Sequence, residues 1–138
     1  MNIVIIDGQG GQLGAQLVKE ASSRFPKATV TAVGTNAVAA AAMHKAGAKA
    51  ATGENPVIVA CRKADVIIGP IGIVIADSLL GEVTPAMAIA VGQAEAVRIL
   101  IPMNKCENLV AGVTGTNTAS LITDAMEKLC DVIENKSL

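Results

Sequence analysis

Short apolar runs that predict strands alternate with stretches of helical periodicity along most of the chain, and this alternation constrains the fold most. The first run, at residues 3–6, is followed by Leu13, Leu17, Ala21 and Phe25 at helical spacing, until Pro26 ends the helix. Further strands are predicted at 30–33, 49–51, 66–68 and 97–101, and further helices at 37–46, 56–63, 71–80, 84–94 and 117–134. The alternation predicts an α/β fold: a Rossmann-like three-layer sandwich with a mostly parallel sheet of five to six strands.

A sixth apolar run, at residues 109–113, follows the fifth after only about seven residues, which is too short for the crossover that a parallel connection needs. We therefore expect the last strand to be antiparallel. No linker, repeat or low-complexity segment divides the 138 residues, a length suited to one hydrophobic core. The sequence predicts a single Rossmann-like nucleotide-binding domain over residues 1–138.

The composition excludes several classes of partner. Hydrophobic residues make up 51% of the chain and charged residues 17%, as expected for buried parallel strands covered by small-residue helices. A net charge of -1 without a Lys/Arg cluster gives no basis for binding nucleic acid or an anionic membrane. The first apolar run is too short for a signal peptide or a membrane span, which predicts a cytoplasmic protein. Cys61, Cys106 and Cys130 form no CxxC pair and are expected to be reduced thiols.

A glycine-rich loop lies between the first predicted strand and the first predicted helix. Its residues Asp7-Gly8-Gln9-Gly10-Gly11-Gln12-Leu13-Gly14 give the spacing GxxGxxG, which resembles the loop of short-chain dehydrogenase-related and prephenate-dehydrogenase-type nucleotide domains. The strict GxGxxG pattern is not met, because position 13 is Leu. Glycines in this position let a pyrophosphate approach the backbone N–H groups at the helix N-terminus. The alternative is a tight strand-to-helix turn that binds no ligand.

Polar residues follow several of the predicted strands, at the edge where doubly wound sheets bind their ligands. Thr35 and Asn36, which follow the second strand, could hydrogen-bond a ribose or a 2′-phosphate, or could instead cap a helix. NAD and NADP are both compatible with the loop, but each assignment is weakened, because no acidic residue stands here for the adenosine ribose and no Arg is adjacent for a 2′-phosphate. The predicted cofactor-binding residues are Asp7, Gly8, Gln9, Gly10, Gly11, Gln12, Leu13, Gly14, Thr35, Asn36, Gly69 and Pro70.

No catalytic group can be assigned from the sequence. Asp7 either accepts a ligand hydroxyl or caps its own loop. Glu54 is either a general base or a charge that complements a helix dipole. Of the residues that follow the fifth strand, Lys105 could meet an anion and Cys106 could be a nucleophile if its pKa were depressed, and a loop without chemistry is the alternative for both; Asn104 has no assigned role. His44 is expected on a helix surface, and no metal site is predicted.

Six short motifs together resemble one family of bacterial proteins. They are Asp-Gly-Gln-Gly-Gly at 7–11, Gly-Thr-Asn-Ala at 34–37, Ala-Thr-Gly-Glu-Asn at 51–55, Ile-Gly-Pro-Ile-Gly-Ile at 68–73, Glu-Val-Thr-Pro at 82–85 and Pro-Met-Asn-Lys-Cys at 102–106. The family is known as domain of unknown function 3842. The resemblance implies a bacterial cytosolic protein and supplies no activity.

The sequence leaves three functions open. The first is a protein that binds a nucleotide, of dinucleotide type, through the glycine loop. The second is an NAD(P)-dependent enzyme whose active site is shared between subunits, and the third is a structural or regulatory subunit without a ligand. A homodimer or larger assembly is expected, because an apolar helix over residues 71–80 would need cover on more than one side.

Overall fold

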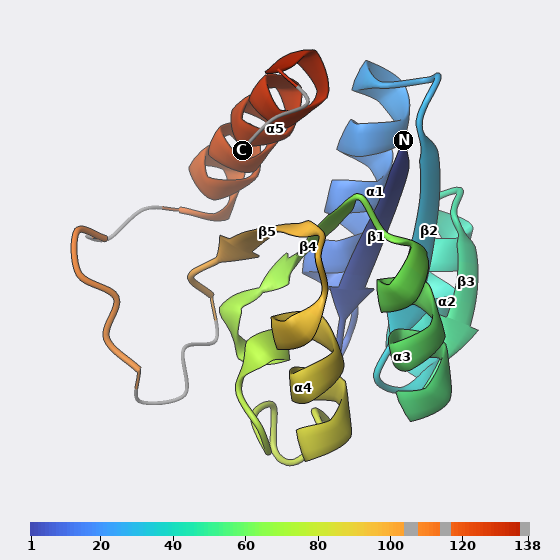
Figure 1. Ribbon diagram of the computed structural model, residues 1–138, viewed down its shortest axis with the longest axis vertical. Helices are drawn as coiled ribbons and strands as arrows, with labels where there is room; N and C mark the ends of the chain where they lie inside the picture. Colours follow the sequence, from blue (N-terminus) through green and yellow to red (C-terminus); the bar gives the residue numbers. More distant parts are fainter. Residues whose placement is uncertain (104–107, 114–116, 136–138) are drawn as a thin grey trace.

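A five-stranded parallel sheet forms the centre of the computed structural model, which describes residues 1–103, 108–113 and 117–135 (Figure 1). The strands are β1 (Asn2–Asp7), β2 (Thr29–Gly34), β3 (Lys49–Thr52), β4 (Val66–Pro70) and β5 (Val97–Ile101). Their order is β3-β2-β1-β4-β5, and every neighbouring pair is parallel. The chain therefore changes direction across the sheet between β1 and β4, which is the switch point where sheets of this order form a ligand crevice.

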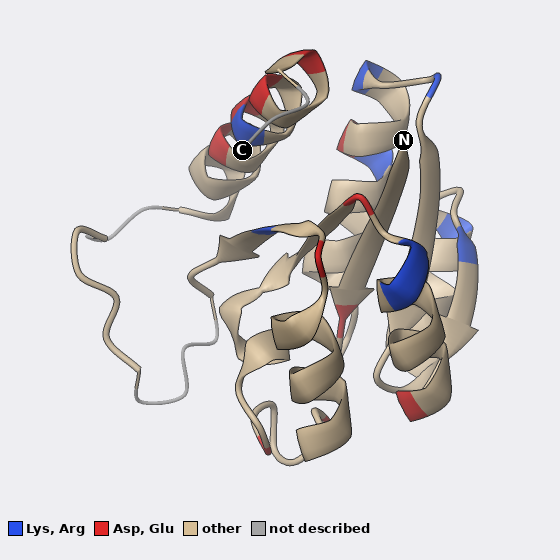
Figure 2. Ribbon diagram, in the orientation of Figure 1, with Lys and Arg blue, Asp and Glu red and all other residues tan. Residues whose placement is uncertain are grey.

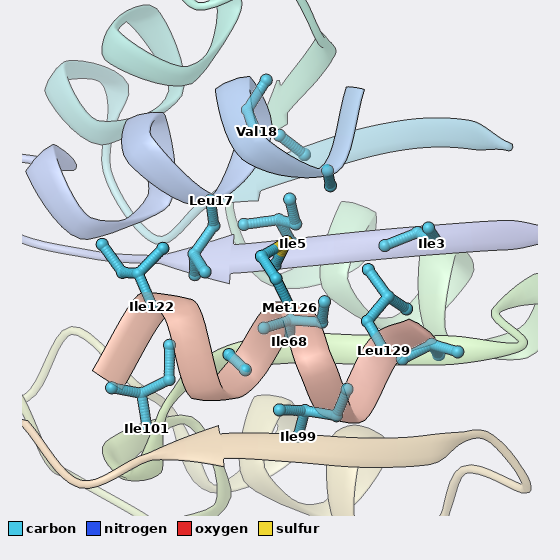
Figure 3. Close-up of a cluster of buried hydrophobic side chains, with 14 of the residues drawn as sticks. Ile3, Ile5, Leu17, Val18, Ile68, Ile99, Ile101, Ile122, Met126 and Leu129 are labelled. Atoms are coloured by element: carbon cyan, nitrogen blue, oxygen red, sulfur yellow. The ribbon is translucent and has the colours of Figure 1, made fainter. Parts of the chain in front are cut away.

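Helices cover both faces of the sheet. One face carries α1 (Gln12–Arg24), α2 (Ala37–Lys45) and α5 (Thr118–Asn135), and the other carries α3 (Glu54–Lys63) and α4 (Pro85–Gln93). Ile3 and Ile5 of β1 pack under α1 and α5 (Figure 3). Val4 and Ile6 of the same strand pack toward α3 and α4. Burial of each such side chain contributes roughly 1.5–3 kcal/mol. The α/β class predicted from the alternation is confirmed.

Three of the helix boundaries are set by residues at the helix ends: two side chains that cap a helix N-terminus and one glycine that follows a helix C-terminus. The Asn36 side chain accepts a hydrogen bond from the Ala39 N–H at the start of α2, and Thr84 accepts one from the Met87 N–H at the start of α4. Gly47, just beyond α2, has a φ of 118°, which favours glycine. The helix starts predicted at 37 and near 84–85 are confirmed for this reason.

The helix predicted over residues 71–80 is wrong. A 3₁₀ turn, η1 (Ile71–Val74), is followed by a closed loop in which the Asp77 N–H donates to the Val83 carbonyl and the Val83 N–H to the Ser78 carbonyl. Leu79 has a positive φ and is buried at 2% exposure, whereas the next residue, Leu80, is 96% exposed. The loop buries its apolar residues by folding back on itself, so the argument for a dimer from an all-round apolar helix no longer holds.

The antiparallel sixth strand is also wrong. Residues 109–113 form a turn, in which the Val113 N–H donates to the Val110 carbonyl and Gly112 has a φ of 85°. Leu109 is 95% exposed, and the segment lies apart from the sheet (Figure 1). Because this segment pairs with no strand, β5 is an edge strand that pairs with β4 alone, and the strands of the described sheet are all parallel.

Within the described ranges, no helix combines the length and the apolar character that a membrane crossing requires.

Candidate functional site

The loop between β1 and α1 lies at the C-terminal edge of the sheet, and the structure brings most of the predicted binding residues together there. Residues 7–14 pass from β1 to α1, and Thr35 and Asn36 follow the adjacent strand β2. Gly69 and Pro70 are the last residues of β4 and are buried. A Cβ at Gly69 would collide with the Ile6 carbonyl oxygen, so that glycine serves the packing of β4 against β1.

Asp7 caps the glycine loop from inside. Its side chain is 5% exposed, and its Oδ1 and Oδ2 accept hydrogen bonds from the Gly8 and Gly14 N–H groups at 2.8 and 2.7 Å. Burial raises the pKa of Asp7, the two backbone hydrogen bonds oppose that rise, and the nearby Glu82 charge adds to it. Since the loop amides engage both oxygens, the geometry favours the capping role over binding of a ligand hydroxyl.

Three of the four loop glycines are required by internal packing. A Cβ at Gly8 would lie 2.5 Å from Thr35 Oγ1, and one at Gly14 would lie 2.5 Å from Met43 Sδ. Gly11 has a φ of 73°, and a Cβ there would lie 2.6 Å from Ala39 Cα, where α1 and α2 cross closely. The GxxGxxG spacing is therefore explained by the fold, with or without a ligand.

Gly10 differs from the other three, because a Cβ there would meet nothing within 4 Å. Around it, the N–H groups of Gly10, Gln12 and Leu13 have no acceptor in the described part of the chain. Gln12 and Leu13 begin α1, whose cap residue Gly11 provides no side-chain acceptor. Donors at a helix N-terminus carry a positive partial charge and attract anions. The loop thus presents three unpaired amides next to an open surface.

Glu82 completes the site, and the sequence analysis did not identify it as a binding residue. Its Oε1 accepts three hydrogen bonds: from the Gln9 N–H at 2.8 Å, from Thr35 Oγ1 at 2.8 Å and from Asn36 Nδ2 at 2.7 Å. Burial alone would raise the pKa of Glu82, but these hydrogen bonds outweigh it and lower that pKa. Asn36 also donates to the Gln9 carbonyl. An ionised carboxylate therefore joins the glycine loop to the end of β2.

The charges at this edge are acidic. Asp7, Glu54, Asp77 and Glu82 all follow or end strands there, and none of the described Lys and Arg residues follows the carboxyl end of a strand (Figure 2). In Figure 2 the basic residues lie elsewhere, including the last turn of α3, which is at the opposite edge. An anionic ligand here would depend on backbone amides, and excess negative charge on it would be unfavourable.

The other candidate groups lie outside this cluster. Glu54 lies in the first turn of α3, the position of a charge that complements the helix dipole, and its Oε1 accepts from Thr84 Oγ1 at 2.7 Å, which connects the starts of α3 and α4. His44 is in the last turn of α2, exposed, at the far end of that helix from Asn36. Asn104, Lys105 and Cys106 lie outside the described residues. Burial raises the pKa of the Cys61 thiol to about 11. The described residues contain no group of three metal ligands.

A separate groove of about 520 Å³ lies beside β2, β3 and α3. Thr31, Ala51, Pro56 and Val59 are among its lining residues, and none of the candidate binding residues contributes to it. The glycine-loop site and this groove are therefore distinct features.

Comparisons with known proteins give one family and one structure. The model of a family described as Domain of unknown function (DUF3842) matches residues 2–134. No curated protein matches the chain. Among solved structures, the chain is similar to a dodecameric FMN-dependent UbiX-like decarboxylase from Escherichia coli O157:H7, with 12% identity and a TM-score of 0.48 over 93% of this chain and 94% of that chain. A similarity of this degree does not extend to ligand, activity or assembly.

Proposed function

The chain belongs to the family described as Domain of unknown function (DUF3842), and we propose that its glycine loop binds a phosphate group of a dinucleotide-type nucleotide. The observation that carries this proposal is the set of unpaired N–H groups of Gly10, Gln12 and Leu13 at the start of α1. Such amides bind phosphate through hydrogen bonds and through the partial charge of the helix terminus.

Gly10 is more direct support for ligand binding than the GxxGxxG spacing is. Packing explains Gly8, Gly11 and Gly14, but a side chain at Gly10 would meet no protein atom within 4 Å. The absence of a side chain there leaves the backbone accessible from solvent. A phosphate on these amides would lie at the C-terminal edge of β1, beside the switch point of the sheet.

NAD and NADP are the first compounds to test as ligands of this loop. NAD carries two phosphate charges and one nicotinamide cation, so it adds little net negative charge to an acidic edge. We assign no catalytic residue, since Asp7 and Glu54 are both engaged in contacts within the protein.

A homodimer or larger assembly and a cytoplasmic location remain predictions. Sedimentation equilibrium tests the first: a monomer at high protein concentration would contradict it.

A thermal-shift panel of NAD, NADP, FAD, ATP and S-adenosylmethionine tests the proposed binding. A ligand at 100 times its Kd that binds only the native state adds about 2.7 kcal/mol, which raises Tm by several degrees. We expect such a shift with at least one of the phosphate-bearing compounds. Absence of any shift at millimolar concentration would refute the proposal.

Two alanine variants make the panel specific to the loop. Gly10→Ala adds a methyl group that points into open space beside the loop, more than 4 Å from the Gln12 and Leu13 nitrogens. We expect it to narrow the approach of a phosphate to the loop and so to reduce the ligand-induced shift. Gly92→Ala is the matched control, because a Cβ at Gly92 in α4 also meets nothing within 4 Å and lies away from the loop. An undiminished shift in Gly10→Ala would place the ligand elsewhere.

A further inference from the structure

The carboxylate of Glu82 lies beside the end of β2, where residues 34–36 of the strand end and its loop include no acidic side chain. Thr35 and Asn36, the first two residues after β2, both donate to its Oε1, as does the Gln9 N–H of the glycine loop. Glu82 itself comes from the segment between η1 and α4, 46 residues beyond Asn36 in the chain. The fold therefore supplies through space the acidic group that residues 34–36 lack.

We propose that Glu82 is a specificity-determining residue, which accepts a hydrogen bond from a ribose hydroxyl and excludes a nucleotide that carries a 2′-phosphate. This inference rests on the proposed nucleotide binding. When a pyrophosphate lies on the loop after β1, the adenosine ribose lies beside the end of β2. All three hydrogen bonds to Glu82 end on Oε1, and Oε2 has no partner in the described part of the chain. That oxygen is the acceptor available to a ribose diol.

The carboxylate is held in place before any ligand arrives. Its loop, residues 77–83, is closed by hydrogen bonds from Asp77 to Val83, from Val83 to Ser78 and from Glu82 to the Leu79 carbonyl. Ser78 is buried, and its hydroxyl donates to the Gly72 carbonyl, which ties the loop to η1. A carboxylate that is already oriented loses little side-chain entropy when it accepts a hydroxyl.

The same charge discriminates between ribose and phosphorylated ribose. A 2′-hydroxyl donates to a carboxylate, whereas a 2′-phosphate brings two negative charges against it. Asp7 lies nearby and adds negative charge, and no described Lys or Arg follows a strand at this edge to neutralise a phosphate. Like charges placed together at a binding site cost several kcal/mol. Glu82 should therefore favour NAD over NADP.

Isothermal titration of NAD and NADP tests the inference, since the two ligands differ only in the 2′-phosphate. We expect the wild-type protein to bind NAD at least about tenfold more tightly than NADP. Glu82→Gln keeps the size of the side chain and an oxygen that accepts the three hydrogen bonds, but it removes the charge. We expect this variant to bring the two affinities to within about threefold.

Two further variants separate charge from shape. Glu82→Asp keeps the charge on a shorter side chain, so it should retain a preference for NAD even if both ligands bind more weakly. Glu54→Gln removes a charge at the same edge of the sheet, away from the glycine loop, and should leave the ratio of the two affinities unchanged. The unfolding midpoint of each variant shows that it is folded.

The outcomes distinguish the inference from the proposed function. If neither dinucleotide binds the wild-type protein, binding of a dinucleotide fails and the inference fails with it. If both bind but NADP binds as tightly as NAD, or if Glu82→Gln keeps the full preference, only the role of Glu82 is overturned.

Discussion

Two loops meet at the C-terminal edge of the sheet, and they reach left-handed backbone conformations in different ways. In the glycine loop, residues 7–14, the left-handed positions are Gln9, with a φ of 50°, and Gly11, with a φ of 73°, whose missing Cβ removes the steric cost. In the Glu82 loop, residues 77–83, four positions are left-handed: one is Gly81, and the other three, Asp77, Leu79 and Leu80, are not glycine and have φ of 66°, 54° and 57°. Each such residue costs roughly 1–2 kcal/mol, so contacts elsewhere must stabilise the second loop.

The stabilising contacts are visible in the core below α4. Leu79 and Val83 are 2% and 1% exposed and pack with Ile73 and Met87. The glycine loop thus depends mainly on its own glycines, with Gln9 as its one non-glycine left-handed residue, and the Glu82 loop depends more on long-range packing. The two loops also divide the proposed chemistry, because the first presents N–H donors and the second a carboxylate acceptor.

The neighbours Leu79 and Leu80 test whether packing fixes the Glu82 loop. Both have positive φ, but Leu79 is 2% exposed and Leu80 is 96% exposed. Asn tolerates the left-handed region, so the substitution relieves backbone strain at both sites, and only at Leu79 does it also remove a buried apolar side chain. We expect Leu79→Asn to destabilise the protein by about 3–5 kcal/mol. We expect Leu80→Asn to stabilise it by about 0.5 kcal/mol.

Urea unfolding of both variants and the wild type measures these free energies. Similar losses at the two positions would show that the loop is not held by the burial of Leu79. A loss at Leu80 alone would mean that its exposed side chain has a partner in solution, such as a second copy of the chain.

A second pair of variants tests whether packing or ligand binding accounts for the glycines. Gly11→Ala puts a Cβ 2.6 Å from Ala39 Cα at a positive φ, and we expect a loss of about 2–4 kcal/mol. Gly10→Ala meets no neighbour within 4 Å, and we expect a change below about 0.5 kcal/mol. Equal losses in urea unfolding at both positions would contradict the distinction between them.

Much of the fold could be predicted because its signals are local. The alternation of apolar β runs with helical periods gave the five parallel strands, and Asn36, Thr84 and Pro85 marked helix starts through capping chemistry. The segment 71–80 was misinterpreted as a helix because its apolar run is too long for one strand, while its true conformation depends on burial of Leu79 in a distant cluster. The run at 109–113 has strand-like residues, but Gly112 turns the chain.

The site was predicted only in part for the same reason. The glycine loop, Thr35 and Asn36 stand next to strand ends, and parallel strands bring such residues to one edge. Glu82 lies between two predicted helices and contacts Gln9, which is 73 residues away in the chain. No local pattern indicates a contact of that range. The one sequence signal was its place in the motif Glu-Val-Thr-Pro at 82–85.

The smallest expected effect is the pH dependence of the contact between the two loops. The folded pKa of Glu82 is lowered, since hydrogen bonds from Gln9, Thr35 and Asn36 outweigh the effect of burial. An acid whose folded pKa lies below its unfolded value stabilises the protein above the unfolded pKa, which is about 4.5 for Glu, and loses that contribution as the pH falls through the folded pKa. The contribution of Asp7 to stability changes with pH in the opposite direction: because its folded pKa is raised, it favours the folded state as the pH falls.

Comparing wild type with Glu82→Gln measures the first effect together with a smaller change at Asp7, because the Glu82 charge helps to raise the Asp7 pKa. We expect the wild type to be the more stable at pH 7, by less than about 1 kcal/mol, because Glu82 is partly exposed and solvent screens its charge. That advantage should shrink as urea unfolding is repeated from pH 6 down through pH 4 and below. A stability advantage of the wild type over Glu82→Gln that is constant or grows on acidification would show that the Glu82 carboxylate is not ionised when it accepts hydrogen bonds from Gln9, Thr35 and Asn36. The contact between the two loops would then not depend on the charge of Glu82.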